Sequence, residues 1–275
     1  MRRTPRSRTI LAAGAALFLA AAALVTAAAP AAAAGPVRVM QFNMCGAMCN
    51  HGAVDKAGAG NDVVDDVRGR VTGFQPAVLT LNEVCVAQFN RLKALLGGGP
   101  WKMSGAFRSQ RDEPGCGPGG AQFGDAVFTA GATSGQKVLG LPNPSGPGGE
   151  HRAVLCVRTA AGGGPLLACV LHTVTGNPLK ARQVAAAARA LNGEAAHSAV
   201  IVGGDFNTDP GGMRALLDSG QGGHFFDVDP QKASTRGGKI DYVLFDRGHF
   251  SNPSGGPQGS KYSDHGVLLG QATHR

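Results

Sequence analysis

"VIVGGDFNTDP", residues 200–210, sets a short apolar run against an abrupt polar ending. The run over residues 200–202 indicates a strand that is buried on both faces. Two glycines follow, and then Asp205 and Asn207 stand on either side of a phenylalanine. A core strand therefore delivers a carboxylate and an amide to one of its ends, and the question is which other strands end beside it.

The first 34 residues have the pattern of a secretory signal peptide. They begin with four arginines, continue with an apolar stretch from about Ile10 to Val25, and end in small residues. The apolar stretch is short and rich in alanine compared with the ~20 residues of a membrane span. We therefore expect cleavage near Ala34, export of residues 35–275 to the extracellular space, and no stable insertion into a membrane.

The length and charge of the remaining chain suit one domain with a substantial core. The chain has 275 residues and a formal net charge of +8, and the four arginines before Ala34, a region without acidic residues, supply half of that charge. The expected mature chain thus has 241 residues and a charge of +4. This mildly basic charge permits a phosphate-bearing partner without requiring one. We expect a monomer.

The chain has six cysteines, and export makes disulfide bonds their expected state. "AVLCVRTAAGGGPLLACVL", residues 153–171, reads as two strands joined at a glycine-rich turn. Cys156 and Cys169 lie at equal distances from the centre of that turn, so a hairpin sets them opposite each other within reach of a bridge. A zinc site at the Cys-x3-Cys motif lacks a matching second set of ligands. Two further bridges, in any of three pairings, remain for Cys45, Cys49, Cys85 and Cys116.

Strands and helices alternate irregularly along the expected mature chain. Helical spacing of valines predicts a helix over residues 61–73, and an alanine-rich run predicts another over residues 177–197, with Pro178 at its first helical position. Two stretches rich in Gly, Pro and Ser, residues 131–151 and 251–263, are expected to be long loops. Besides the hairpin strands and the opening strand, the expected strands are 37–43, 76–84, 122–130, 239–245 and 265–271.

Polar side chains gather at the ends of several expected strands. If these strands share a sheet, the side chains meet at one edge of the core, where α/β folds usually bind their ligands. Asp241 instead lies inside its expected strand, where a charge is unfavourable unless it is paired. The residues at the strand ends are Asn43, Glu83, His172, Asp205, Asn207, Asp264 and His265.

These residue types together suit one kind of chemistry. Glu83 and Asp264 offer oxygen ligands to a hard divalent ion such as Mg²⁺. His172 and His265 are candidates for proton transfer and for stabilising anionic oxygens near neutral pH. Carboxylates, one metal ion and histidines fit the hydrolysis of a phosphate ester.

Each of these residues also has an ordinary structural interpretation. Asp205 could cap a turn together with Asn207. Asp241 could pair with a nearby lysine, and His172 could simply be packed at the end of its strand.

Seven short motifs occur in one order across nearly the whole expected mature chain: "QFN", "LNEV", "GDAVFT", "LHT", "GDFN", "IDYVL" and "SDH". Any one of them arises by chance. As an ordered set they resemble the endonuclease/exonuclease/phosphatase superfamily, which has the deoxyribonuclease-I-like fold. The resemblance implies an α/β (α+β) chain folded as a four-layer sandwich of two mainly antiparallel β-sheets flanked by helices, with residues 35–275 as the catalytic domain.

The resemblance also implies a metal site. Glu83 resembles the principal metal ligand of the superfamily, with Asn43 and Asp264 near the ion. The implied ion is Mg²⁺, with Mn²⁺ or Ca²⁺ as alternatives. The arginine that often follows the metal-binding glutamate in the family is replaced here by Val84 and Cys85.

The remaining residues resemble the catalytic groups of the superfamily. Asp205 and Asn207 resemble the pair that orients the attacking water and the phosphate. His265 resembles the catalytic histidine, and Asp241 resembles the carboxylate that fixes its tautomer. His172 resembles a second histidine that assists the leaving group or holds a phosphate oxygen. Whether His265 or Asp205 removes the proton of water stays open at this point.

The substrate has to be argued from other residues. The "NTDP" that continues the "GDFN" motif argues against inositol-phosphate phosphatases, which usually have an arginine there. A secreted sphingomyelinase needs an apolar, aromatic-rich hairpin for the bilayer, and the chain has one Trp and two Tyr. Basic residues near the expected catalytic loops suit nucleic-acid phosphates instead; they are Arg108, Arg111, Arg152, Lys180, Arg182 and Lys261.

We therefore expect a secreted phosphodiesterase, foremost a nuclease acting on DNA or RNA. A lipid phosphodiesterase of the sphingomyelinase type is the alternative enzyme. A non-catalytic secreted binding protein on the same scaffold is the alternative of a different class, because a fold does not fix a function.

Overall fold

One parallel strand pair at the centre of each sheet organises the architecture. β1 (Val37–Asn43) runs parallel to β2 (Val78–Cys85), and β7 (Gly164–His172) runs parallel to β8 (Ala199–Asp205). A parallel pair needs a crossover connection. The helix α1 (Asn61–Phe74) lies in the first crossover and α3 (Leu179–Ala195) lies in the second.

The structure is a computed structural model. It describes residues 35–46, 61–98, 101–110, 116, 122–144, 150–161 and 163–275, which all belong to one unit spanning Ala32–Arg275. The expected signal peptide and Cys49 lie outside the described residues. Within the described ranges, no helix combines the length and the apolar character that a bilayer crossing requires.

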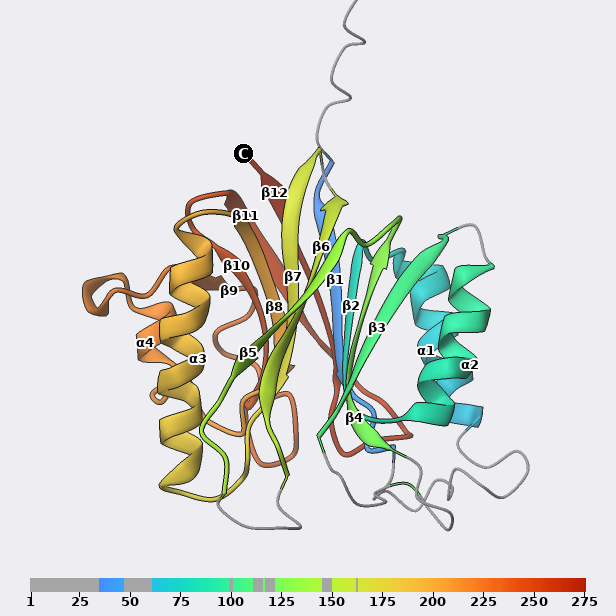
Figure 1. Ribbon diagram of the computed structural model, residues 1–275, viewed down its shortest axis with the longest axis horizontal. Coiled ribbons are helices and arrows are strands. Elements are labelled where there is room, and N and C mark those ends of the chain that lie inside the picture. Colours follow the sequence, from blue (N-terminus) through green and yellow to red (C-terminus); the bar gives the residue numbers. More distant parts are fainter. Residues whose placement is uncertain are drawn as a thin grey trace, which may run out of the picture. The chain divides into compact units, whose positions relative to one another are not determined.

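The other elements complete two six-stranded sheets (Figure 1). They are α2 (Val86–Gly97), β3 (Met103–Ser109), β4 (Phe123–Ala130), β5 (Gly135–Gly140), β6 (Ala153–Ala161), α4 (Arg214–Leu217), a 3-10 turn (Ser219–Gln221), β9 (Phe225–Asp227), β10 (Asp241–Asp246), β11 (Phe250–Gln258) and β12 (Val267–His274). The strand orders are β11-β12-β1-β2-β4-β3 and β5-β6-β7-β8-β10-β9. Every neighbouring pair except the two central ones is antiparallel, so the expectation of two mainly antiparallel sheets is confirmed.

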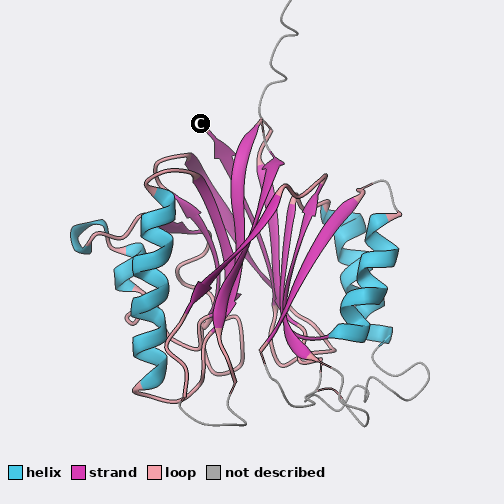
Figure 2. Cartoon of the chain, in the orientation of Figure 1, coloured by secondary structure: helices cyan, strands magenta, loops and turns pink. Residues whose placement is uncertain are grey.

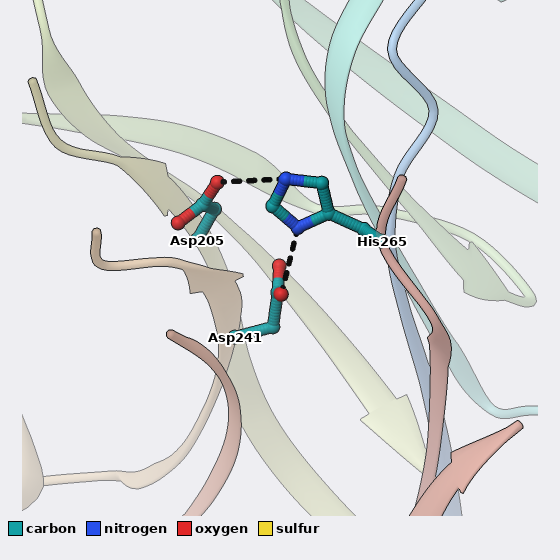
Figure 3. A group of neighbouring side chains, drawn as sticks. All are labelled: Asp205, Asp241 and His265. Carbon is teal, nitrogen blue, oxygen red and sulfur yellow. Dashed lines mark hydrogen bonds and ion pairs between the residues drawn. The ribbon is translucent and has the colours of Figure 1, made fainter. Parts of the chain in front are cut away.

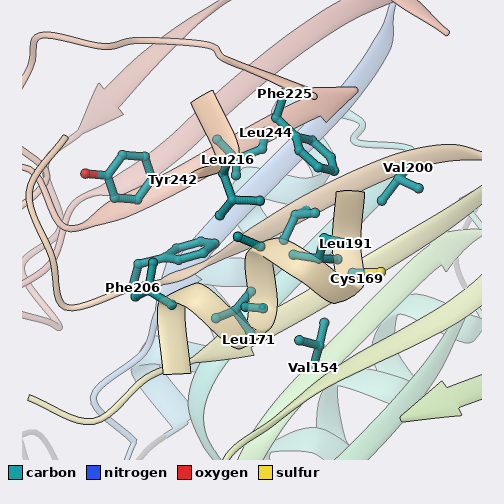
Figure 4. Packing of buried hydrophobic residues seen from close by; sticks show 14 of the residues in the cluster. Val154, Cys169, Leu171, Leu191, Val200, Phe206, Leu216, Phe225, Tyr242 and Leu244 are labelled. Atoms are coloured by element: carbon teal, nitrogen blue, oxygen red, sulfur yellow. The ribbon is translucent and has the colours of Figure 1, made fainter. Parts of the chain in front are cut away.

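Three apolar clusters separate four layers. One cluster lies between the two sheets, a second lies between the first sheet and the helices α1 and α2, and a third lies between the second sheet and α3 with α4. Figure 2 shows the sheets between the outer helices. Figure 4 shows the third cluster, in which Phe206 and Leu216 pack near Leu191 of α3. Along β8, Val200 and Val202 belong to this cluster while Ile201 faces the other sheet. The predicted burial of this strand on both faces and the four-layer sandwich are thus confirmed.

The two glycines at the end of β8 allow the backbone to approach its neighbours. A Cβ atom on Gly203 would lie 2.0 Å from Oγ1 of Thr80 on the other sheet. A Cβ atom on Gly204 would lie 2.2 Å from the carbonyl oxygen of Leu171 on β7. Glycine is therefore required at both positions by close approach rather than by turn geometry.

The prediction of long loops over residues 131–151 and 251–263 is partly wrong. Residues 135–140 form β5 and residues 250–258 form β11, and both strands lie at the edge of a sheet. An edge strand pairs on one side only, so it tolerates residues such as Pro253 and Pro257 that a central strand excludes. The helix expected over residues 177–197 is shorter at both ends, and Pro178 is its N-cap residue rather than its first helical residue.

The hairpin disulfide is confirmed. Cys156 and Cys169 face each other directly in the β6–β7 register and are bonded. Cys85 is bonded to Cys116, which selects one of the three open pairings, and Cys45 is also disulfide-bonded. Such bonds fit an oxidising compartment.

The close approach at Gly203 generates a stability prediction. Gly203→Ala should lower the free energy of unfolding by ~1–3 kcal/mol, because the added methyl group overpacks the space in front of Thr80. Gly69→Ala is the matched control: this helical glycine of α1 has open space around it, so alanine should raise stability by ~0.5–1 kcal/mol. Urea unfolding measures both. Equal effects of the two substitutions would contradict this account of the inter-sheet contact.

Candidate active site

Four strand ends from both sheets meet at one place. Nδ2 of Asn43, the last residue of β1, donates hydrogen bonds to Oε1 of Glu83 and to Oδ2 of Asp205, both at 3.1 Å. Nε2 of His172, the last residue of β7, lies 3.5 Å from the same Asp205 oxygen. These four side chains meet as predicted, but the premise of one shared sheet is wrong, because β1 and β2 belong to one sheet and β7 and β8 to the other.

Two of the predicted residues have an uncommon backbone conformation. Glu83 has φ +56°, and the β2–β4 register shifts between Leu81 and Val84 around it. A bulge of this kind re-aims a side chain. Asn207 has φ +49° just after β8, where its backbone N–H donates to Oδ1 of Asp205 at 2.8 Å. Positive φ values in non-glycine residues are uncommon and concentrate at functional sites.

His265 lies between two carboxylates (Figure 3). Its Nδ1 is 2.8 Å from Oδ2 of Asp241, and its Nε2 is 3.8 Å from Oδ2 of Asp205. Asp241 and Asp205 are register partners on β10 and β8, which explains why both reach the same ring. The carboxylate of Asp241 fixes the tautomer with a proton on Nδ1 and directs Nε2 toward Asp205.

The loop before β12 is anchored so that it presents His265. Oγ of Ser263 donates to the carbonyl oxygen of Asn43 at 2.8 Å and accepts the backbone N–H of His265 at 3.1 Å. Asp264 points outward: its side chain is 73% exposed, against 10% for His265, and its Oδ1 lies 4.0 Å from Nε2 of the histidine. Asp264 thus stands at the rim of the site.

A pocket of about 700 Å³ opens onto these groups. Asn43 and Asp241 are fully buried behind its wall. The other six predicted residues line it, together with several that the sequence did not indicate. The polar lining residues are Glu83, Glu150, Arg152, His172, Thr175, Asp205, Asn207, Thr235, Arg236, Asp264 and His265.

The positive charges of His265 and Arg152 compensate the carboxylates of the site only in part. Burial raises the pKa of Glu83 above its usual value, and the hydrogen bond from Asn43 offsets this only in part. Burial and the charge of Asp241 raise the pKa of Asp205 to about 8. A divalent cation would supply the missing positive charge, so the donor set fits a hard metal ion.

The two histidines have opposite electrostatic environments. Burial disfavours a charge on His265, but the hydrogen bond and charge of Asp241 and the charge of Asp205 raise its pKa to about 9. Burial, followed by the charge of Arg152, holds the pKa of His172 well below its usual value. His265 is therefore cationic and His172 neutral at pH 7 in the metal-free protein, which separates their chemical roles.

Two sets of residues could hold a metal ion. Ligand atoms of Asp205, Asp241 and His265 lie within 4.8 Å of one another, but the hydrogen bond between Nδ1 and Asp241 already uses one side of the ring. Glu83 and Asp264 offer oxygens on the pocket side. As oriented here, Asn43 turns its N–H groups to the carboxylates, while its Oδ1 accepts the backbone N–H of Cys45 at 3.0 Å.

The structure adds a residue that sequence reasoning missed, Asn82. It is fully buried, and its Oδ1 accepts the backbone N–H of Asp205 at 3.0 Å and Nε2 of Gln41 at 2.7 Å. Its Nδ2 donates to Oδ1 of Asp125 at 2.8 Å and to the carbonyl oxygen of Leu171 at 3.0 Å. A polar residue inside the apolar run of "LNEV" was the available signal.

A second missed group connects Asn82 to the pocket. Nε2 of Gln110 donates to Asp125, and Nη1 of Arg152 donates to Oε1 of Gln110 at 2.8 Å. Burial raises the pKa of Asp125 to about 7, opposed by the hydrogen bond from Asn82. Among the expected basic residues, Arg152 is a nearly buried part of the pocket wall, and Arg108 donates from Nη1 to the carbonyl oxygen of His151 at 2.7 Å. Arg111 lies outside the described residues.

Comparisons with known proteins place the chain in a family. A model of the Endonuclease/Exonuclease/phosphatase family matches residues 40–265. No curated protein sequence matches the chain.

Solved structures share the fold at low sequence identity. The catalytic domain of human Nocturnin with bound sulfate has a TM-score of 0.68 and 16% identity, over 87% of this chain and 94% of that one. An endonuclease/exonuclease/phosphatase from Bacteroides vulgatus has a TM-score of 0.65 and 15% identity, over 88% of this chain and 100% of that one. D. rerio TDP2, in complex with a single-strand DNA product, has a TM-score of 0.60 and 12% identity, over 86% and 99%.

The electrostatics of the site predict that the metal-free protein loses stability as pH rises from 6.5 to 9. The proton on His265 stabilises the fold below pH 6.5, and this contribution is lost as pH rises through the folded-state pKa of about 9. The raised pKa of Asp205 acts in the same direction. Urea unfolding in the presence of a chelator measures the effect.

Asp241→Asn should flatten this pH profile, because it removes the hydrogen bond and charge that raise the pKa of His265. The matched control is Asp65→Asn, at a half-exposed side chain of α1, which should leave the slope unchanged. A wild-type stability that is constant or rises over this range contradicts the assignment.

Proposed function

The chain belongs to the endonuclease/exonuclease/phosphatase family, whose members are mostly hydrolases of phosphodiester bonds, and on this basis we propose that it is a secreted, metal-dependent phosphodiesterase that cleaves DNA or RNA. One observation carries the proposal. His265 is hydrogen-bonded to Asp241, and its other ring nitrogen faces Asp205 in a pocket that Glu83 also lines.

Hydrolysis needs a base for water and positive charge near the phosphate. The oxygen of water bonds to phosphorus while the bond from phosphorus to the leaving oxygen breaks. Water gives one proton to a base, and the leaving oxygen takes up one proton. Burial raises the pKa of Asp205 to about 8, and the positive charge of a bound divalent ion would lower it, so that the ionised carboxylate could accept the proton of water. His265 is protonated and lies 3.8 Å from Oδ2 of Asp205, where its positive charge stabilises the negative charge of the phosphate.

Other residues orient these groups. Asp241 keeps Nε2 of His265 directed into the site. Asn207 is fixed by a bond from its Nδ2 to the carbonyl oxygen of Thr173 at 2.9 Å, and its amide lines the pocket. His172 is neutral at pH 7 and can donate a hydrogen bond to a phosphate oxygen or assist the leaving group.

The proposed metal ligands are Glu83 and Asp264, with Asn43 beside them, and the proposed ion is Mg²⁺, with Mn²⁺ or Ca²⁺ as alternatives. A bound divalent ion supplies positive charge to the phosphate oxygens. The raised pKa values of the buried carboxylates support such an ion at this place.

Nucleic acid is favoured over lipid by the surface. Within the described part of the chain, Val138 is the only large apolar side chain that is exposed, and it lies on β5. A lipid phosphodiesterase needs an apolar surface to dock on a bilayer. Arg152 and Arg236 line the pocket instead and suit a polyanionic substrate. The structure of D. rerio TDP2, of the same fold, contains a single-strand DNA product.

Secretion is supported by the amino-terminal sequence and by the disulfide bonds. The cysteines of the described residues are all bonded, which is expected outside the cytosol. We propose that the mature protein acts as a monomer.

The test is cleavage of linear DNA and RNA with Mg²⁺, with and without a chelator. The wild-type protein should release fragments only with the metal. His265→Ala and Glu83→Gln should each lower kcat by roughly 10²-fold or more, because a proton-transfer or metal-binding group is lost. The matched controls, His197→Ala and Glu194→Gln, change exposed or partly exposed residues outside the pocket and should retain wild-type rates.

Full activity in either site variant would sink the assignment of that residue. Sphingomyelin vesicles tested alongside separate the alternatives. Hydrolysis of the vesicles without cleavage of nucleic acid favours the lipid phosphodiesterase, and binding of either substrate without hydrolysis favours a binding protein.

A further inference from the structure

A second pocket, of about 870 Å³, adjoins the active site. It lies between residues 233–236 and residues 257–266, and we call it the basic groove. The basic groove and the active-site pocket share the lining residues Thr235, Arg236, Asp264 and His265. The two therefore form one continuous depression, with the catalytic histidine on the shared wall.

The fold holds the basic groove in shape. Its two walls are tied by the backbone N–H of Gly266, which donates to the carbonyl oxygen of Ser234 at 2.7 Å, and by a β-bridge beside it. On the far wall, Arg70 of α1 donates to the carbonyl oxygen of Gly259 at 2.8 Å and to Oε1 of Gln258 at 3.3 Å. These contacts hold the walls in place around an open groove, so a ligand would find a preformed site.

The lining of the basic groove suits an extended polyanion. Arg236 and Lys261 are exposed cations, and the hydroxyl group of Ser260 and the amide group of Gln258 accompany them. Asp264 is the only acidic residue of the lining and lies at the rim shared with the active site. Arginine, lysine, serine and glutamine are common donors to the phosphates of nucleic acid.

The lining of the basic groove contains no Phe, Tyr or Trp, and its one aromatic ring is that of His265 at the wall shared with the active site. Proteins that bind single strands through their bases use aromatic platforms for stacking. The chemistry of this groove therefore fits the backbone of a polynucleotide rather than its bases, and it predicts weak dependence on sequence.

A third pocket also adjoins the active-site pocket. It has about 380 Å³, and it shares Asn207 and Ile240 with the active-site pocket. Lys180 and Asn177, at the start of the α3 region, line it. The active-site pocket thus adjoins two depressions through two different sets of residues, which gives a polynucleotide room to continue beyond the scissile bond at two places.

We propose that the basic groove binds the backbone phosphates of a polynucleotide next to the scissile bond, and that the polynucleotide runs through the active site so that internal bonds are cleaved. This inference rests on the proposed function. Hydrolysis at an internal bond adds one water across the bond between phosphorus and oxygen. It leaves one chain that ends in a phosphate and one that ends in a hydroxyl group.

The first arm of the test uses Arg236→Gln/Lys261→Gln and a single-stranded circular DNA. The value of kcat/KM for this DNA should fall roughly tenfold, and the slope of log(kcat/KM) against log[salt] should become shallower by about 1.4, because two phosphate contacts to a single strand are lost. Hydrolysis of bis(p-nitrophenyl) phosphate, which has no flanking phosphates, should fall much less. Lys93→Gln/Arg189→Gln, which removes two exposed cations from the helices α2 and α3, should match the wild type.

The second arm compares the circular DNA with a linear DNA of the same sequence. Internal cleavage predicts that the circle is opened at a rate similar to that of the first cut in the linear chain, and that the early products are long fragments. Release of mononucleotides from the linear DNA with an intact circle overturns this inference while the proposed function stands. Equal DNA activity of the groove variant and the wild type overturns it as well.

Two further outcomes separate this inference from the proposed function. If bis(p-nitrophenyl) phosphate is hydrolysed but neither DNA nor RNA is cleaved, the proposed nuclease function itself fails. If the groove variant instead loses activity on vesicles of sphingomyelin, the basic groove serves a lipid headgroup and the assignment to a polynucleotide is overturned.

Discussion

Behind the hydrogen bonds by which Asn43 joins Glu83 to Asp205, the buried amide of Asn82 makes a second link between the two sheets. It accepts the backbone N–H of Asp205 from β8 and donates to the carbonyl oxygen of Leu171 on β7, although it belongs to β2 of the other sheet. Gln41 and Asp125 satisfy its remaining groups. A buried amide with all its partners present specifies one relative placement of its neighbours, because any shift leaves a polar group unpaired. The distance between Glu83 of one sheet and Asp205 of the other therefore depends on this contact together with the two hydrogen bonds of Asn43.

The geometry that this contact imposes is electrostatically unfavourable without a substrate or an ion. Asp205 and Asp241 are register partners on neighbouring strands, and both are almost fully buried. Glu83 adds a third carboxylate and a left-handed backbone conformation. Such groups persist only where the surrounding structure over-determines them, and active sites are where they concentrate. The alanine- and valine-rich core on both faces of the sheets stabilises the fold and so offsets the cost of the buried carboxylates and of the strained backbone at Glu83.

The sequence predicts the site better than it predicts the network behind the site. Strand-end residues such as Asp205 and His265 stand out because a charge after an apolar run has few structural uses, and the paired cysteines of the hairpin follow from symmetry about a turn. The roles of Asn82 and Asp125 are not predictable in this way, because the function of a polar residue inside a strand follows only from its hydrogen-bond partner. The partner of Asn82 on β8 is 123 positions away. The edge strands β5 and β11 were hidden for a related reason: pairing on one side leaves composition free, so glycine and proline there resemble a loop.

One segment of the chain carries both the proposed catalytic histidine and a proposed phosphate-binding residue. Residues 257–266 provide Lys261 to the basic groove and His265 to the active site, and Ser263 between them is bonded to the carbonyl oxygen of Asn43. A substrate phosphate held in the groove therefore acts on the segment that positions the catalytic ring. Binding energy from parts of a substrate remote from the reacting bond accelerates a reaction only when it is used to orient the reacting groups. An anchored loop with a binding residue four positions before the catalytic one is a direct physical means of coupling the two, and it would favour long polyanions over small phosphodiesters at the step of catalysis as well as at the step of binding.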